Sequence, residues 1–465
     1  MCSNSHDEYE WNKLKHSLSS YKEKIKNLEK EYSISEIEYI ANLINQLDAP
    51  ENIKELFYIQ QKQAELGGGF YGIIPEPIKH PEEIPVPDSP ENFLELISYL
   101  LHIRKMQREA VSSVGFPIQF SGDSYIPKKN ILSNSKIKII LDFQAIKEVL
   151  AYFFSKNPTY NEAYRIANNE IFKEMVKHRN SLGYVPGPEF TTQYLADFLF
   201  FAASKKPVYE VWKWINPWNF FDFADIYSNK ERYKTLIETL EKNKEDIESY
   251  ISFKLEKYTP EGFEFQEKFV FGVEWAIRGW ATDKFGGVNI EHVKDNYKFL
   301  IDTIIHETFH RIQAVLYPGN NNKEFTMLEK PLQDKKLDAF YKAMTYVFLE
   351  GTATHVQKGA FSNKSIPDVQ AAVNIFNEIY KTIFQKKEYE KLETLLNEGL
   401  RSNGPFYALG HYMSHIIEQN YSNEAIADCL VKGSPEFFKL FLNTKEGKIF
   451  PKNISDIIKN IDIPL

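Results

Sequence analysis

The amino-acid sequence predicts a mainly α protein with a small β-sheet, that is, an α+β fold, and three observations support this. Apolar residues recur at helical spacings of three and four through most of the chain beyond residue 137, which is typical of amphipathic helices. Two segments, 268–277 and 283–291, have the composition expected of strands, the first from its β-branched and aromatic residues and the second introduced by a glycine pair. The 465 residues are 43% hydrophobic and 15% aromatic, which suits two or three folded units.

Residues 1–66 are predicted to form an N-terminal helical hairpin or coiled coil. Ser35-Glu36-Ile37-Glu38 has the form of a capping box that begins a second helix, and a third helical pattern covers 51–66. We expect a hairpin, with self-association of residues 11–32 as a dimerising coiled coil as the alternative. Apolar residues alternate at spacings of three and four in the first helix, as in a heptad seam: Trp11, Leu14, Leu18, Tyr21, Ile25, Leu28 and Tyr32.

The rest of the chain divides into four parts. Residues 67–92, rich in glycine and proline, are predicted to be a linker, and 93–136 a connecting segment. Residues 137–292 form a predicted helical lobe that ends in a strand, and 293–465 a helical region that carries the candidate catalytic residues. Helices are expected within the lobe at 142–155, 160–178, 193–204 and 231–257.

Composition excludes several classes of protein. The net charge of -8 leaves no basic excess to neutralise phosphates, so nucleic acid is not expected as a partner. Two cysteines, Cys2 and Cys429, cannot form a disulfide framework. No apolar run approaches 18 residues, so no transmembrane segment is expected. The chain as given is expected to be cytoplasmic. The alternative is an exported lipoprotein in which Cys2 is the mature N-terminal cysteine.

The motif His306-Glu307-Thr308-Phe309-His310 lies in an apolar stretch from 299 to 316. Side chains four residues apart share one helical face, so both imidazoles can reach one metal ion. Glu307 lies about 100° further round the helix, where it can act on a water. This HExxH pattern predicts a hydrolase that binds one Zn²⁺ through His306 and His310 and uses Glu307 as general base. The alternative is a chance match of ordinary hydrogen-bonded residues.

A catalytic zinc site needs a third protein ligand, which should come from a later element. Glu350 is the best candidate, because it lies among apolar and small residues on a helix predicted at 338–358, and a buried carboxylate needs a cation or donors. Gly351 and Ala353 would let this helix approach the HExxH helix closely. A hydrogen-bonded structural glutamate is the alternative. Weaker candidates are Glu324, Glu329 and Asp338, with His355 as a supporting residue or competing ligand.

A donor to the oxyanion is expected on a later helix. Tyr407 and His411 are four residues apart there, and Gly410 allows close packing. We take Tyr407 and His411 as catalytic candidates, with Tyr412 and His415 as further options. A structural hydrogen bond is an equal alternative for each.

HExxH followed by a glutamate on a later helix resembles the gluzincin branch of zinc metallopeptidases. The resemblance implies a zincin-like catalytic core in which a glycine-containing edge strand before the motif helix binds the substrate backbone. The matching residues would be Gly286, Gly287, Val288 and Asn289. Thr354 stands where many gluzincins place an aspartate that orients the first histidine, so another acceptor is expected.

More narrowly, the chain from about residue 137 to its C-terminus resembles an uncharacterised bacterial family of zinc-dependent peptidases. The features are Asp142-Phe143, the HETFH pentapeptide, Glu350-Gly351 and the Tyr407-x-x-Gly410-x-x-Met413 segment. The resemblance implies a peptide or protein substrate and one zinc ion per chain. The alternatives are a zinc hydrolase of a non-peptide amide or ester, and an inactive metal-binding scaffold that acts through protein interaction.

Overall fold

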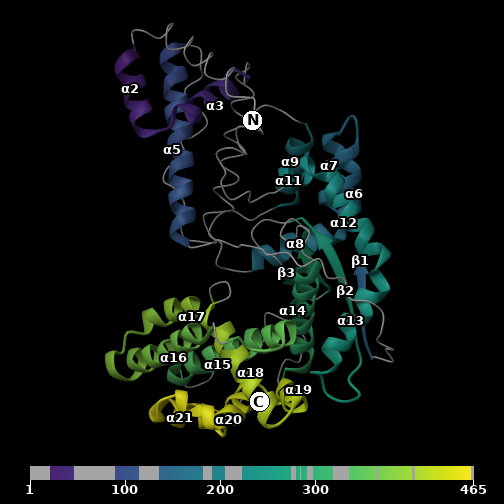
Figure 1. Ribbon diagram of the computed structural model, residues 1–465, viewed down its shortest axis with the longest axis vertical. Coiled ribbons are helices and arrows are strands. Elements are labelled where there is room, and N and C mark those ends of the chain that lie inside the picture. Colours follow the sequence, from purple (N-terminus) through teal and green to yellow (C-terminus); the bar gives the residue numbers. More distant parts are fainter. Residues whose placement is uncertain are drawn as a thin grey trace. The chain divides into compact units, whose positions relative to one another are not determined.

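The computed structural model is mainly helical and contains a small four-stranded sheet, so the predicted fold class is confirmed (Figure 1). None of the described helices is both long enough and apolar enough to cross a bilayer. The residues that the structure describes are 21–46, 89–114, 136–181, 191–204, 223–273, 279–282, 284–290, 297–317, 335–362, 365–400 and 404–461.

The chain forms two compact units, one made of 1–121, 144–237 and 272–276, the other of 122–143, 238–271 and 277–465. In the first unit, α2 (Lys22–Glu31) and α3 (Ile34–Asn45) pack against each other and against α5 (Pro90–Val114). The cap of α3 lies two residues earlier than predicted, because the Ser33 side chain accepts from the Glu36 N–H. The third helical pattern at 51–66 and the linker up to residue 88 lie outside the described residues. Self-association through 11–32 stays a prediction.

Two of the helices that were predicted as continuous are divided, each at or just after an asparagine. The Nδ2 of Asn168 donates to the Tyr164 carbonyl at 2.9 Å, and the next helix begins just beyond. Asn243 does the same to the Thr239 carbonyl at 2.7 Å. The backbone N–H of each asparagine donates to the same carbonyl, so the side chain adds a second bond at the end of the helix. The helices of this part of the chain are α6 (Gln144–Phe154), α7 (Tyr160–Ala167), α8 (Glu170–Ser181), α9 (Thr192–Ser204), α11 (Phe223–Ser228), α12 (Lys230–Lys242) and α13 (Lys244–Glu256).

The sheet belongs to the second unit and has the strand order β1-β2-β4-β3. β1 (Ile137–Asp142) pairs in parallel with β2 (Phe265–Gly272), and β3 (Gly279–Ala281) pairs antiparallel with β4 (Gly286–Asn289). The expectation that Gly286–Asn289 forms an edge strand is therefore wrong, since β4 lies between β2 and β3. Among the described strands β3 forms that edge, and its three residues are too few to show strand periodicity in the sequence. β1 was likewise not predicted.

Two of the described helices pack against this sheet, and the helices that follow them in the chain build the rest of the second unit. α13 packs on β1, and α14 (Tyr297–Leu316) packs on β3 and β4. α14 is buried on most of its circumference, as predicted, with Ile304, Ile305 and Phe309 fully buried. The remaining helices are α15 (Lys335–Lys358), α16 (Ile366–Tyr380), α17 (Leu392–Leu400), α18 (Pro405–Asn420), α19 (Asn423–Lys432), α20 (Ser434–Leu442) and α21 (Lys452–Lys459), with short helical turns at 381–386, 389–391 and 445–449.

α15 and α18 touch through their backbones. A Cβ atom on Gly351 would lie 2.1 Å from the Cα of Gly410, and one on Gly410 would lie 2.0 Å from the Val347 carbonyl oxygen. Only glycine fits both positions. The close packing predicted for Gly410 is present, but Gly351 faces α18 and not α14, contrary to expectation. This contact brings the helix that carries Glu350 beside the helix that carries Tyr407.

Candidate metal centre

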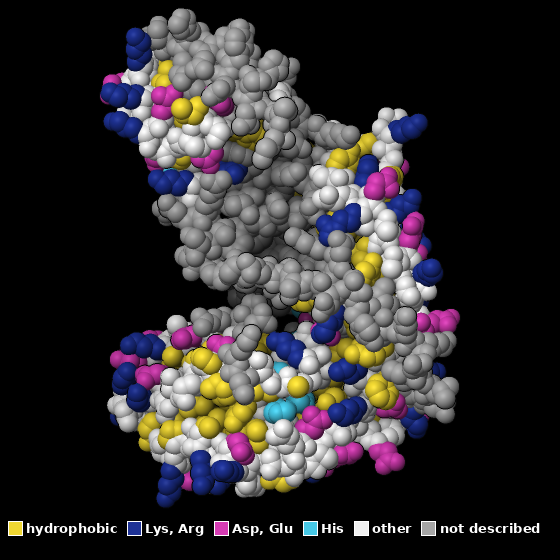
Figure 2. Space-filling model, in the orientation of Figure 1, with side chains coloured by type: hydrophobic (Ala, Val, Ile, Leu, Met, Phe, Trp, Pro, Cys, Tyr) yellow, Lys and Arg dark blue, Asp and Glu magenta, His cyan; other side chains and the backbone are white. Residues whose placement is uncertain are grey.

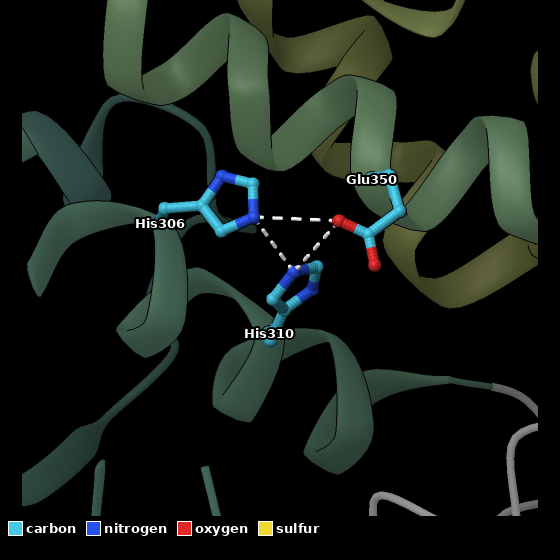
Figure 3. Close-up of side chains that lie close together, drawn as sticks. All are labelled: His306, His310 and Glu350. Atoms are coloured by element: carbon cyan, nitrogen blue, oxygen red, sulfur yellow. Dashed lines mark hydrogen bonds and ion pairs between the residues drawn. The ribbon is translucent and has the colours of Figure 1, made fainter. Parts of the chain in front are cut away.

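His306 and His310 on α14 converge with Glu350 on α15 (Figure 3). The Nε2 atoms of the two histidines lie 3.0 Å apart. Oε2 of Glu350 lies 3.4 Å from Nε2 of His306 and 3.3 Å from Nε2 of His310. The one-turn spacing on α14 puts both imidazoles on the same face, and α15 crosses over that face.

These three atoms fit a zinc ion by their spacing and their chemistry. Ligand atoms about 2.0–2.1 Å from a tetrahedral zinc lie about 3.3 Å from one another, close to the 3.0, 3.3 and 3.4 Å observed. Oε2 of Glu350 is buried without a hydrogen bond among the described residues. Two imidazoles and one carboxylate are also a common catalytic zinc donor set. Within the described part of the chain, no other group of three or more such side chains brings its ligand atoms this close.

The charges of the three side chains support one another. Burial alone would lower the pKa of the His310 imidazole, but the Glu350 carboxylate raises it to about 9. Burial alone would raise the pKa of Glu350, but His310 and His306 hold it well below its usual range. The carboxylate is therefore charged at neutral pH and attracts a cation. A metal ion bound there would displace a proton from the imidazole.

The centre is open to solvent on one side. The side chains of His306 and Glu350 are 13% and 20% exposed, whereas His310 is 5% exposed. Figure 2 shows histidine side chains at the surface of this part of the molecule, among hydrophobic, acidic and basic side chains. An open position is what a water and a substrate need at a catalytic metal.

Glu307 points from α14 towards the edge strand β3. A Cβ atom on Gly279 would lie 2.5 Å from Cγ and 2.7 Å from Oε1 of Glu307, so glycine makes room for this side chain. Glu307 is partly exposed, and burial raises the pKa of its carboxyl against the opposing effect of His306 and His310. A carboxylate beside the two histidines and next to a strand edge is suited to act as a base. Gly279 carries no such signal in the sequence.

The structure separates the two candidates on α18. The Tyr407 ring lies parallel to the His306 ring, with centroids 6.4 Å apart, so Tyr407 flanks the metal centre. His411 lies one turn further on, where its Nε2 donates to the Gly359 carbonyl at 2.9 Å. Burial lowers the pKa of His411 to about 4, so it is neutral at physiological pH. His411 therefore has a structural partner away from the three converging side chains.

The other sequence candidates are engaged elsewhere or not described. Nε2 of the fully buried His355 lies 2.9 Å from Oε2 of Glu418, and Nε2 of His415 accepts from Gln419 at 3.1 Å. Tyr412 packs its ring against Phe361, with centroids 5.2 Å apart. Asp338 pairs with Lys342 at 3.2 Å. Glu324 and Glu329 lie outside the described residues.

One contact at the centre was not foreseen. Nδ1 of His310 lies 2.7 Å from Oε1 of Gln313, three residues later on α14. Thr354, which stands at the aspartate position of gluzincins, is buried, but the acceptor that the structure offers to a histidine is Gln313. The signal was available in the sequence, because residues three apart on a helix are neighbours.

The glycine-bearing strand β4 lies inside the sheet. Gly286, Gly287, Val288 and Asn289 are all buried. A Cβ atom on Gly286 would meet the Phe269 ring at 2.7 Å, and one on Gly287 would meet the Trp280 ring at 2.3 Å. These glycines accommodate aromatic side chains, and the strand edge beside Glu307 is β3.

Comparison with protein families gives a match that covers the candidate centre. The model of the family described as "Putative zinc dependent peptidase (DUF5700)" matches residues 200–444, which is more than half of the chain and narrower than the expected span from about 137 to the C-terminus. The matched range contains α14, α15 and α18 with all the side chains of the centre. Comparisons with curated proteins and with solved structures give no match.

Proposed function

We propose that this chain, which belongs to the family described as "Putative zinc dependent peptidase (DUF5700)", hydrolyses peptide bonds at one zinc site, with Glu307 as the general base. The observation that carries the proposal is the triangle of His306, His310 and Glu350 with Glu307 beside it. A purely structural zinc site closes all four positions with protein ligands. Three ligands, an open side and an adjacent carboxylate favour catalysis over a scaffold.

Each side chain has a separate task in this mechanism. His306, His310 and Glu350 would hold the zinc. When bound, the ion supplies Lewis acidity, which polarises a carbonyl and lowers the pKa of a water in its open position. A carboxylate oxygen of Glu307 accepts the proton of the attacking water and passes it to the leaving amine nitrogen. The hydroxyl of Tyr407 is the proposed donor to the developing oxyanion.

The edge strand β3 favours a peptide over another amide or ester. Gly279 at the start of β3 lies against Glu307, and β3 ends the sheet within the described residues. An extended peptide can add to such an edge through main-chain hydrogen bonds. Bound in this way, its scissile bond would pass the general base. We therefore propose substrate binding at β3 in place of Gly286, Gly287, Val288 and Asn289 of β4.

Metal analysis together with cleavage of a peptide library tests the proposal. We expect one zinc per chain, cleavage by the wild type, and a Glu307→Gln variant that keeps zinc but has lost activity. Glu393→Gln, a change on the exposed surface of α17, is the matched control and should behave as wild type. Absence of zinc would reject the proposal. Zinc without peptide cleavage would favour the non-peptide hydrolase or the scaffold, and ester and amide substrates would then separate these two.

A further inference from the structure

The side-chain amide of Gln313 joins the two helices that carry the candidate zinc ligands. Gln313 is fully buried on α14, and its Oε1 lies 2.7 Å from Nδ1 of His310. Its Nε2 donates to the Leu349 carbonyl oxygen at 3.0 Å and to Oγ1 of Thr352 at 2.8 Å. Both acceptors belong to α15, and they stand on either side of Glu350 in the sequence.

The surroundings of this amide decide which of its ends faces His310. A backbone carbonyl can only accept hydrogen bonds, so the amide nitrogen must face Leu349. The Thr352 hydroxyl already donates to a carbonyl one turn earlier in α15, at 2.7 Å, so towards Gln313 it accepts. The amide oxygen is left for His310, and an oxygen acceptor requires a hydrogen on Nδ1. Nε2 of His310, which faces the other two ligand atoms, then carries the lone pair when the ring is neutral.

We propose that Gln313 is a positioning residue of the zinc site. Its oxygen holds His310 in the tautomer and orientation that direct Nε2 at the metal, and its nitrogen ties that ring to the helix of Glu350. The inference rests on the proposed function, because it concerns the binding of zinc by these residues. Nδ1 of His306 has no hydrogen-bond partner among the described residues. Of the two histidines, His310 is therefore the one whose ring orientation is fixed by a described side chain.

The physical reason is that partners of this kind orient a metal-binding imidazole and raise its basicity. A glutamine supplies the acceptor without adding a second negative charge beside Glu350. It also supplies two N–H donors, which an aspartate could not, and both are used by α15. The Gln313 side chain thus links the His310 ring to the part of α15 that carries Glu350.

Three variants separate this role from a general packing role. Gln313→Met keeps the length of the side chain but removes both functions of the amide. Gln313→Glu keeps an oxygen for Nδ1 of His310. Thr352→Val is the matched control, because it removes one acceptor of the amide nitrogen and leaves the contact of Gln313 with His310 intact. Zinc affinity is measured by chelator competition well below the unfolding temperature of each protein.

We expect Gln313→Met to weaken zinc binding by about 10–100-fold. Gln313→Glu, which keeps the oxygen for Nδ1 of His310 but loses the N–H donors to α15, should lose clearly less, and Thr352→Val should stay close to wild type. The visible spectrum of the Co²⁺-loaded protein should change most in the Met variant. Wild-type affinity in Gln313→Met, or equal loss in Gln313→Glu, would overturn the inference and leave the proposed function standing. A wild type that binds no zinc would overturn both.

A measurement on the wild type covers the case in which Gln313→Met does not fold. In the zinc-loaded protein with ¹⁵N-labelled histidine, Nδ1 of His310 should carry a slowly exchanging hydrogen, since Gln313 accepts it in a buried position. An unprotonated Nδ1 at this ring would reject the assignment. Zinc content in the same sample reports on the proposed function separately.

Discussion

Replacement of Gly279 by alanine should disable Glu307 without touching the metal ligands. The added Cβ atom would lie 2.5 Å from Cγ and 2.7 Å from Oε1 of Glu307, and 2.8 Å from Cγ2 of Thr303. Non-bonded carbon atoms rest about 3.5–4.0 Å apart. The Glu307 side chain must therefore move by about 1 Å from its Cγ atom onward, and the carboxylate moves with it.

The size of the effect follows from that displacement. A misplacement of about 1 Å at a catalytic group costs about 100-fold in rate, which is about 2.7 kcal/mol of activation free energy. We expect Gly279→Ala to lower kcat/KM by this amount. Zinc content should stay at the wild-type level, because no ligand atom is among those that the new Cβ meets most closely.

The assay combines kcat/KM on the best library peptide with zinc content and thermal unfolding, in a double-mutant cycle with Glu307→Gln. If Gly279→Ala acts through Glu307, it should cost little further activity in the Glu307→Gln background. Unchanged activity in the single variant would refute the reasoning, and so would a full additional loss in the double variant. Loss of zinc would show that the strand shift reaches the ligands.

Three further changes test other parts of the structure. Tyr407→Phe should lower kcat by about 10²–10³-fold with zinc retained, as for loss of an oxyanion donor, and unchanged kcat would remove Tyr407 from the mechanism. Glu267 on β2 lies 3.4 Å from Arg311, and burial raises its pKa from 4.5 to about 7. The preference of the folded protein for the protonated Glu267 carboxyl therefore stabilises it fully below pH 4.5. As the pH rises through 7, this contribution to the free energy of unfolding, roughly 3 kcal/mol, is lost. Urea unfolding of Glu267→Gln should lack this pH dependence, and an identical slope in both proteins would contradict it. Gly351→Ala would bring a Cβ within 2.1 Å of the Gly410 backbone and should cost about 3 kcal/mol of unfolding free energy, whereas wild-type stability would show that α15 and α18 do not touch.

The fold class and the pair of histidines could be predicted from the sequence because both depend on local geometry. Helical periodicity is repeated over whole segments, and two histidines four residues apart share a helical face wherever the helix lies. Glu350 was also named from its surroundings, since a carboxylate among apolar residues needs a partner. The strands at 265–272 and 286–289 overlap the two segments that were predicted from their β-branched and aromatic residues, whereas β1 at 137–142 was missed although it is longer than β4.

The remaining features depend on contacts between distant segments, and only the tertiary structure decided them. Periodicity tells which face of a helix is apolar, but not which neighbour covers it. Gly351 of α15 was therefore expected to pack against α14, but it packs against α18. β3 has three residues and forms the edge beside Glu307, a place that the sequence assigned to β4. The bonds of Gln313 to α15 span 36 and 39 residues. The HExxH residues by themselves predict a zinc site. The packing of α15, α18 and β3 around α14 decides which other groups lie beside these residues. They are Glu350, the ring of Tyr407 and the strand edge at Gly279.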